Sequence, residues 1–247
     1  TTKPDGEAET GPTKEEASET DTHKGIVYLD PTDLTKTCTK EQAESNLNEN
    51  GTPTEVKTGC MKWYIYSEDE SNYTMILDHN TTARIKWNDD NKNVAYESSN
   101  LYAVVEDLKT TSGWVVNPRI ITTEEINTIT GKTGWTSTGS WYCFDSKTND
   151  TTKWCAKAKD SSSYKWLFNN LYDCENYGCS VKDDNNYEGT GTAASGQTYG
   201  YWTSTIRENS TTYVWRVSRN GHVMGNNVNE ELRGIRPVIT INKSIVS

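Results

Sequence analysis

The chain is poor in apolar residues: only 32% of its 247 residues are hydrophobic, and just two are Phe. No apolar run approaches the roughly 20 residues that a membrane-spanning helix needs. Cations are also in deficit, with 25 Lys and Arg against 35 Asp and Glu, a formal net charge of −10. Such a chain lacks the clustered cations that bind phosphates, so we expect no nucleic-acid partner. The 14 Tyr and 9 Trp nevertheless argue against full disorder.

Signatures of common catalytic and metal centres are missing as well. The chain holds neither HExxH nor GxSxG, and its three His do not form the close pairs typical of zinc sites. Asp78–His79 suggests acid–base chemistry, but no nucleophile motif lies nearby, so we interpret it as a polar turn. The acidic runs at 68–70 and 183–184 lack EF-hand spacing. Calcium binding is therefore unsupported, and we expect no cofactor and no enzymatic activity.

Residues 1–24 differ in composition from everything that follows. They contain no Val, Ile, Leu, Met, Trp, Tyr, Phe or Cys, and they carry three Lys and seven acidic residues. Such a segment buries too little apolar surface to offset the entropy of ordering it, which predicts a disordered linker. Because the chain begins at Thr1 rather than Met, we expect a spacer that follows an upstream anchor; a solubilising tail is the alternative. Residues 25–54, beyond a short β run at Ile26–Leu29, are expected to form an irregular arm.

Six cysteines are spread along the chain: Cys38, Cys60, Cys143, Cys155, Cys174 and Cys179. An even number of cysteines suits an oxidising compartment, which predicts an extracellular or cell-surface location. Six cysteines allow 15 pairings, and the sequence does not choose among them. Pairing of neighbours, 38–60, 143–155 and 174–179, is the simplest hypothesis. A redox-active pair at 174 and 179 is an alternative, but we favour structural disulfides.

Local patterns predict a hairpin and two helices in the first half. Met61–Tyr66 and Tyr73–Asp78 are aromatic and β-branched runs on either side of an acidic turn, which is typical of a hairpin. Apolar residues over 101–108 recur at i, i+3, i+4 and i+7, which predicts an amphipathic helix. Thr122 and Glu125 form a capping box at the start of a second helix.

The C-terminal part predicts a group of strands. The β patterns are Tyr201–Ile206, Thr212–Ser218 and His222–Met224, and Asn220–Gly221 between the last two is a type I′ hairpin signal. Residues 234–241 predict a single final strand. Residues 132–198, in contrast, are rich in turn formers and predict long loops.

Three of these motifs carry a family resemblance. Tyr201–Thr205, Trp215–Val217 and Gly234–Val238 together resemble the end of prokaryotic C-type-lectin-like domains. That group includes formylglycine-generating-enzyme-like domains and the variable proteins of diversity-generating retroelements. Runs at Gly59–Tyr64 and Met75–Asn80 are similar to those of a family of surface proteins from Gram-positive gut bacteria.

The resemblance covers residues 55–247 and implies an α+β, C-type-lectin-like fold: two helices flanking a small antiparallel sheet, with long disulfide-held loops. In such a fold the planar guanidinium of Arg236 would hold backbone carbonyls or a carboxylate. Trp202 and Trp215 would fill the inner face of the sheet. Trp87–Asp89 matches the calcium- and sugar-binding tripeptide of true C-type lectins, but it precedes the helices and lacks its partner loop. We therefore interpret it as a turn.

Charge is distributed unevenly along the chain. Residues 207–247 carry six cations and three acids, a net of +3, so residues 1–206, with 19 cations and 32 acids, carry −13. The excess of cations in residues 207–247 predicts a surface that binds an anionic or polar ligand. The alternative is that the Arg residues of this segment pair internally with acidic residues of 1–206. The expected ligand residues are Tyr213, Trp215, Arg219, His222, Asn226, Asn227 and Asn229.

We therefore expect an adhesin-like binding protein, secreted or displayed on a bacterial surface. Its expected partner is a glycan, peptide or protein of a host or bacterial surface, bound through the loops and hairpin of residues 201–233. Contact with a membrane is expected only through the upstream anchor. Two alternatives stay open: a pilin-like structural subunit and, if a free thiol exists, an enzyme of the formylglycine-generating type.

Overall fold

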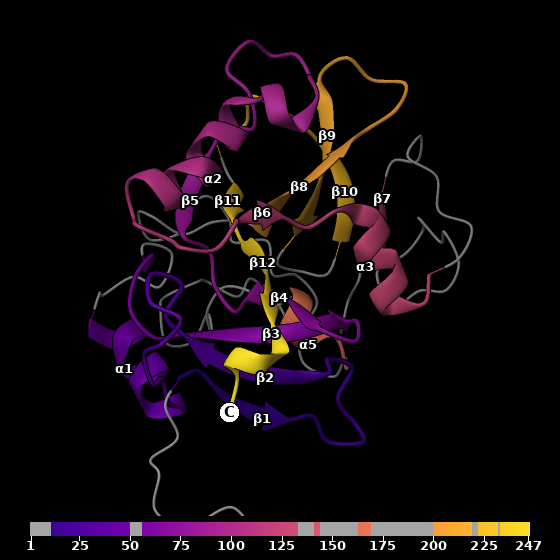
Figure 1. Ribbon diagram of the computed structural model, residues 1–247. Helices are drawn as coiled ribbons and strands as arrows, with labels where there is room; N and C mark the ends of the chain where they lie inside the picture. The colour runs from indigo at the N-terminus through magenta and orange to yellow at the C-terminus, as the bar shows by residue number, and fades with distance from the viewer. Residues whose placement is uncertain are drawn as a thin grey trace, which may run out of the picture.

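The computed structural model describes residues 11–49, 56–132, 141–143, 163–168, 200–218, 222–231 and 233–247. Within these ranges the strands form two six-stranded, mainly antiparallel sheets, and helices lie beside both (Figure 1). The expected α+β class is confirmed, with two sheets instead of one small sheet.

The first sheet joins the two ends of the described chain. Its order is β1-β2-β3-β4-β12-β6. The strands are β1 (Thr13–Glu16), β2 (Gly25–Leu29), β3 (Met61–Glu68), β4 (Asn72–Leu77), β12 (Pro237–Asn242) and β6 (Arg119–Ile120). The predicted hairpin is confirmed as β3 and β4, and β12 pairs with the outer edge of β4.

Strand β1 corrects the prediction that all of residues 1–24 are disordered. Residues 13–16 pair with β2 along their whole length. The Thr13 hydroxyl donates to the Cys38 carbonyl at 2.6 Å, and the Tyr28 hydroxyl donates to the Glu15 carboxylate at 3.0 Å. Residues 13–16 are ordered by backbone hydrogen bonds to the edge of β2, and such bonds need no apolar side chains. The amino-acid composition of the segment therefore does not reveal this strand.

The expected irregular arm over 25–54 is also corrected. Strand β2 lies between β1 and β3, and the helix α1 (Lys40–Glu49) follows. The expected domain boundary at residue 55 thus falls inside one sheet. A disulfide between Cys38 and Cys60 confirms the first neighbour pairing. The pairs 143–155 and 174–179 involve side chains outside the described part of the chain.

The second sheet holds the predicted C-terminal strands in the order β5-β11-β8-β9-β10-β7. The strands are β5 (Thr82–Ile85), β11 (Arg233–Ile235), β8 (Gly200–Ile206), β9 (Tyr213–Ser218), β10 (His222–Asn227) and β7 (Trp141–Cys143). Strands β9 and β10 pair antiparallel, as the hairpin prediction requires; the turn residues 219–221 lie outside the described ranges.

The final strand is not continuous. Residues 234–241 were expected as one strand, but the chain divides at Arg236 into β11 of the second sheet and β12 of the first. Pro237 is the first residue of β12, a position where a residue without a backbone N–H is tolerated in a sheet. Because the break transfers the chain between sheets, Arg236 lies at their junction.

The two predicted helices are confirmed. Helix α2 (Asn100–Thr110) begins at Ser99, whose hydroxyl accepts the backbone N–H of Tyr102 at 3.1 Å. Helix α3 (Thr123–Thr130) begins with the predicted capping box of Thr122 and Glu125. Shorter helical turns are η2 (Tyr96–Ser98), α5 (Lys165–Phe168) and η3 (Lys243–Ile245).

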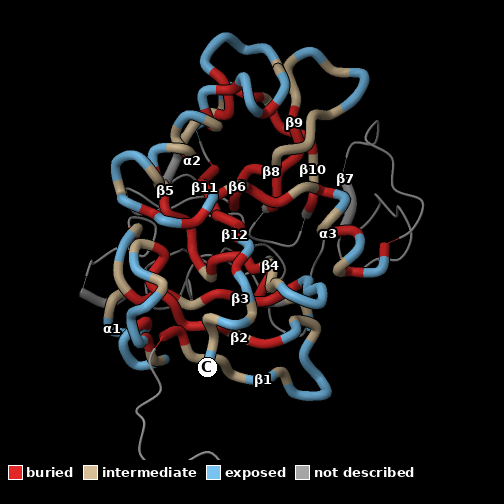
Figure 2. Tube along the Cα trace, in the orientation of Figure 1, coloured by how far each residue is buried: buried red, intermediate tan, exposed pale blue. Residues whose placement is uncertain are grey.

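Both faces of the second sheet are buried, and one predicted Trp lies on each. Trp215 packs with Tyr201 and Val238 in the core shared with the first sheet and α3. Trp202 packs under α2 with Leu101. The two Trp were expected on one inner face, but Trp202 pairs in register with Arg216, the neighbour of Trp215, so they face opposite ways. Figure 2 shows buried strands in both sheets and exposed connections around them.

Candidate functional site

The predicted ligand residues do not meet in one place. Tyr213 and Asn227 are register partners at one end of the β9–β10 hairpin. His222 is the partner of Cys143 at the other end, about 16 Å away at the usual rise of a strand. Arg219 and the side chain of His222 lie outside the described part of the chain. The predicted set is thus divided along the hairpin.

Two members of the set are buried. Trp215 is fully enclosed in the core, so its role is the structural one expected for it rather than ligand contact. Asn226 is buried as well, and its amide donates to the Glu230 carboxylate. Tyr213 and Asn227 are half-buried and Asn229 is exposed. These three therefore remain accessible at one end of the hairpin.

The expected cationic face is not formed by the described arginines. Arg216, Arg233 and Arg236 are all buried. Arg207 is half-buried, with its guanidinium carbon 5.5 Å from the centre of the Tyr213 ring. Arg236 is used internally, but its hydrogen bonds go to backbone carbonyls and not to the acidic residues with which the sequence alternative would pair it.

Arg236 has the role expected of a structural arginine. Its guanidinium donates to the Leu77 carbonyl and, at 2.8 Å each, to the carbonyls of Trp166 and Leu167. The cation also lies 5.4 Å from the centre of the Tyr201 ring. Burial lowers the pKa of Arg236, and three carbonyl acceptors compensate for the lost water. The guanidinium thus holds backbone carbonyls, one of the two uses expected of its planar fork.

A polar surface forms where three turns meet, at 88–93, 207–212 and 228–231; we call it the distal pole. The Asn93 amide donates to the carbonyls of Ser210 at 2.6 Å and Tyr213 at 3.0 Å, which joins the first two turns. In Figure 1 these two turns lie at the upper end of the molecule, and the C-terminus lies at the lower end.

Val228 joins the third turn to the other two. Its carbonyl accepts the backbone N–H groups of Trp87 at 2.8 Å and Asn88 at 3.0 Å, and its own N–H donates to the Thr212 carbonyl at 2.9 Å. Three segments that are distant in sequence are therefore cross-linked by main-chain hydrogen bonds. A surface fixed in this way loses little conformational entropy when it binds a partner.

The exposed side chains of the distal pole are mainly amides and carboxylates: Asp89, Asp90, Asn91, Glu208, Asn209, Asn229 and Glu231. Lys92 adds an exposed ammonium. Asn91 and Asn209 have left-handed backbones, with φ of 51° and 61°, which Asn tolerates in turns. Residues 88–91 do form the predicted turn. The sequence predicted the turn at 88–91, but nothing in it indicated that this turn meets those at 207–212 and 228–231.

The Asp78–His79 pair is internal. His79 is buried, with Nδ1 2.5 Å from Asp78 Oδ1 and Nε2 3.2 Å from the Val56 carbonyl oxygen. A polar turn was expected here, and the residues do follow the end of β4. Because both ring nitrogens are occupied by protein atoms, the pair ties residue 56 to β4 and serves structure.

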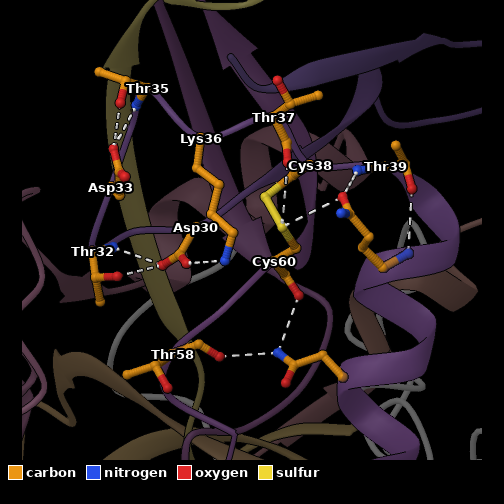
Figure 3. Close-up of polar contacts among 12 residues, drawn as sticks. Asp30, Thr32, Asp33, Thr35, Lys36, Thr37, Cys38, Thr39, Thr58 and Cys60 are labelled. Atoms are coloured by element: carbon orange, nitrogen blue, oxygen red, sulfur yellow. Dashed lines mark hydrogen bonds and ion pairs between the residues drawn. A yellow bond between two sulfur atoms is a disulfide. The ribbon is translucent and has the colours of Figure 1, made fainter. Parts of the chain in front are cut away.

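A separate pocket of about 510 Å³, which we call the cavity, lies beside the Cys38–Cys60 disulfide, and its polar surroundings are drawn in Figure 3. It is open to solvent, since most of its lining residues are exposed. The lining residues are Lys36, Glu41, Gln42, Ser45, Asn46, Gly59 and Cys60. Of these residues, only Gly59 and Cys60 belong to motifs that stand out in the sequence. The lining residues come from the segment before α1, from α1 itself and from the start of β3, so only the fold brings them together.

Charged groups on the cavity wall are fixed by hydrogen bonds. Lys36 Nζ lies 3.0 Å from the carboxylate of Asp30, which is buried and also accepts from the Thr32 hydroxyl at 2.6 Å. Hydrogen bonds from its own backbone N–H and from Thr39 lower the pKa of Glu41, so this exposed carboxylate is ionised at neutral pH. The cavity thus presents one cation and one anion.

The neutral groups of the wall are also held in place. The Thr39 backbone N–H donates to Gln42 Oε1 at 2.8 Å, and the Asn46 amide donates to the carbonyls of Thr58 at 2.9 Å and Cys60 at 3.1 Å. Gly59 has φ of +85°, and a Cβ there would lie 3.0 Å from Asn46 Nδ2. The close approach of helix and strand therefore depends on glycine.

Comparisons with protein-family models, curated proteins and solved structures give no match for the chain. Among the described helices, none combines the length and the apolar character needed to cross a membrane. Nor do three His, Cys, Asp or Glu side chains of the described ranges gather as a metal site would require. A function is therefore inferred from the geometry of the distal pole and of the cavity.

Proposed function

We propose that this chain is an adhesin-like binding protein of the C-type-lectin-like class, which recognises a glycan, peptide or protein through its distal pole. The observation that carries the proposal is the main-chain cross-linking of the three turns at 88–93, 207–212 and 228–231. Loops that carry recognition on a rigid scaffold are a common way to build a binding site. Two helices beside antiparallel sheets and the Gly234–Val238 motif support the class.

The chemistry of the pole favours a hydroxyl-rich or cationic partner. Amides both donate and accept hydrogen bonds, and carboxylates accept them, so sugar hydroxyls or Lys and Arg side chains find suitable groups there. An anionic partner would meet the carboxylates of Asp89, Asp90 and Glu208. The disulfide between Cys38 and Cys60 supports a location outside the reducing cytosol, on a cell surface or in secreted form.

Binding to arrays of host glycans and extracellular matrix proteins, with and without calcium, tests this function. The test variant combines Asn91→Gly, Asn209→Gly and Asn229→Ala, since glycine keeps the two left-handed turns. We expect at least one saturable ligand, whose affinity falls about tenfold or more in the triple variant. Asn117→Ala removes an exposed amide outside the pole and should bind like the original chain.

Two outcomes would contradict the proposal in different ways. An affinity unchanged in the triple variant would place the binding surface elsewhere. Absence of any ligand, together with concentration-dependent self-association in analytical ultracentrifugation, would support a structural surface subunit instead.

A further inference from the structure

We propose that the cavity beside the Cys38–Cys60 disulfide is a second binding site, which takes one neutral sugar unit. Its volume of about 510 Å³ lies within the roughly 300–1,000 Å³ usual for small-molecule sites. It is also large enough for a pyranose ring with bound water. The proposal does not depend on the function of the distal pole.

The functional groups of the wall favour a sugar over other small ligands. Lys36 can only donate hydrogen bonds, Glu41 can only accept them, and Ser45 does both. A hydroxyl group also does both, so adjacent sugar hydroxyls satisfy all three wall groups. An anion would be opposed by the ionised carboxylate of Glu41, whereas Lys36 is already paired with Asp30. An apolar molecule would cover the hydroxyl of Ser45 and the exposed carboxylate of Glu41 without replacing their hydrogen bonds to water.

The wall is organised before any ligand arrives. Gln42 is fixed to Thr39 at the start of α1, and Lys36 is anchored to the buried Asp30. The disulfide joins the segment before α1 covalently to the start of β3. Figure 3 shows these contacts surrounding the sulfur–sulfur bond. These held groups therefore have little conformational entropy left to lose on binding.

The site is separate from the distal pole. Helix α1 lies beside the first sheet, whereas the turns at 88–93 and 207–212 lie at the opposite end of the view in Figure 1. A chain with both sites would hold an extended glycan, or two different ligands, at two separated places. Variants at one site should therefore leave the other unchanged.

Ligand-observed NMR on the whole chain tests the proposal. The probes are glucose, galactose, N-acetylglucosamine and their neutral disaccharides, with glycine as a zwitterion and inorganic phosphate as an anion. We expect saturable binding of at least one neutral saccharide, with weaker or no binding of glycine and phosphate. Ser45→Trp should fill the cavity and reduce this affinity at least tenfold, and Glu41→Gln should weaken it severalfold.

A matched variant separates filling of the cavity from damage to α1. Glu44→Trp places the same bulky side chain on the neighbouring exposed position of α1, which does not line the cavity, and it should bind like the original chain. Undiminished saccharide binding by Ser45→Trp would overturn the site. Absence of saccharide binding by the original chain, or preference for glycine or phosphate, would overturn the ligand class. The distal-pole triple variant should retain the saccharide signal, so failure of either proposal can be recognised independently.

Discussion

Arg236 shows how one side chain connects the two sheets. It lies between β11 and β12. Its guanidinium donates to the carbonyl of Leu77, the last residue of β4, and to the carbonyls of Trp166 and Leu167 in α5. Gly234, two residues earlier, makes this crossing fit: a Cβ there would lie 2.3 Å from Asn80 Nδ2. The Gly–Ile–Arg–Pro motif is therefore explained by packing at the junction of the sheets.

Replacing Arg236 with Lys should destabilise the chain strongly. A Lys ammonium keeps the charge but lacks the planar fork that serves three carbonyls at once. Each buried carbonyl left without a donor costs about 1–3 kcal/mol, so we expect the free energy of unfolding to fall by about 2–5 kcal/mol. Urea denaturation measures this. Arg207→Lys, at a half-buried position, should cost less than about 1 kcal/mol, and equal losses in the two variants would contradict the assignment.

The elements differ in how far they follow from local sequence. Helices α2 and α3 and the β3–β4 hairpin were predicted because their periodicity and capping residues lie within a few positions of one another. Strand β1 was missed because its order depends on β2 and on Cys38, and the break at Arg236 was missed because it depends on two sheets. Contacts between distant segments leave no local signal.

The same distinction applies to the candidate sites. The turn at 88–91 was predicted from Asn and Asp, but its contact with Ser210 and Val228 was not. Trp215 and Asn226 were assigned to a ligand face because short β runs do not reveal which side is buried. The cavity beside α1 was not predicted, since its groups come from separate segments that only the fold brings together.

The disulfide is expected to stabilise the N-terminal elements. Cys38 and Cys60 are 22 positions apart, and closing such a loop restricts the unfolded chain by roughly 3 kcal/mol. The double variant Cys38→Ser with Cys60→Ser should lose about 2–4 kcal/mol in free energy of unfolding. Its β1 amides should also exchange hydrogen faster, because the Cys38 carbonyl anchors Thr13. Exchange of β1 no faster than in the original chain would show that β1 is held without this covalent support.

The segments on the two sides of the expected boundary at residue 55 share one sheet and one buried cluster. Strand β2 pairs with β3, and Tyr28 and Cys38 pack against Cys60 across the expected boundary at residue 55. A fragment that starts at residue 56 would expose the edge of β3 and the side chain of Trp63, which is fully buried in the chain.

This fragment should therefore fail to reach the native state. We expect it to aggregate or to lack the near-ultraviolet circular dichroism of the original chain, whose aromatic residues are held rigidly. A shorter truncation that removes only residues 1–10 should retain that signal. A soluble fragment from residue 56 with the native aromatic spectrum would restore the domain boundary expected from composition.

The position of β12 has a consequence for how the chain acquires its structure. Strand β12 fills the gap between β4 and β6, and the backbone N–H of Ser247 donates to the Pro12 carbonyl at 3.0 Å. The first sheet, begun near residue 13, is thus completed only by residues beyond 236. A chain that leaves the ribosome from its N-terminus must wait for strand β12 before this sheet closes, and until then the edge of β4 needs protection from other chains.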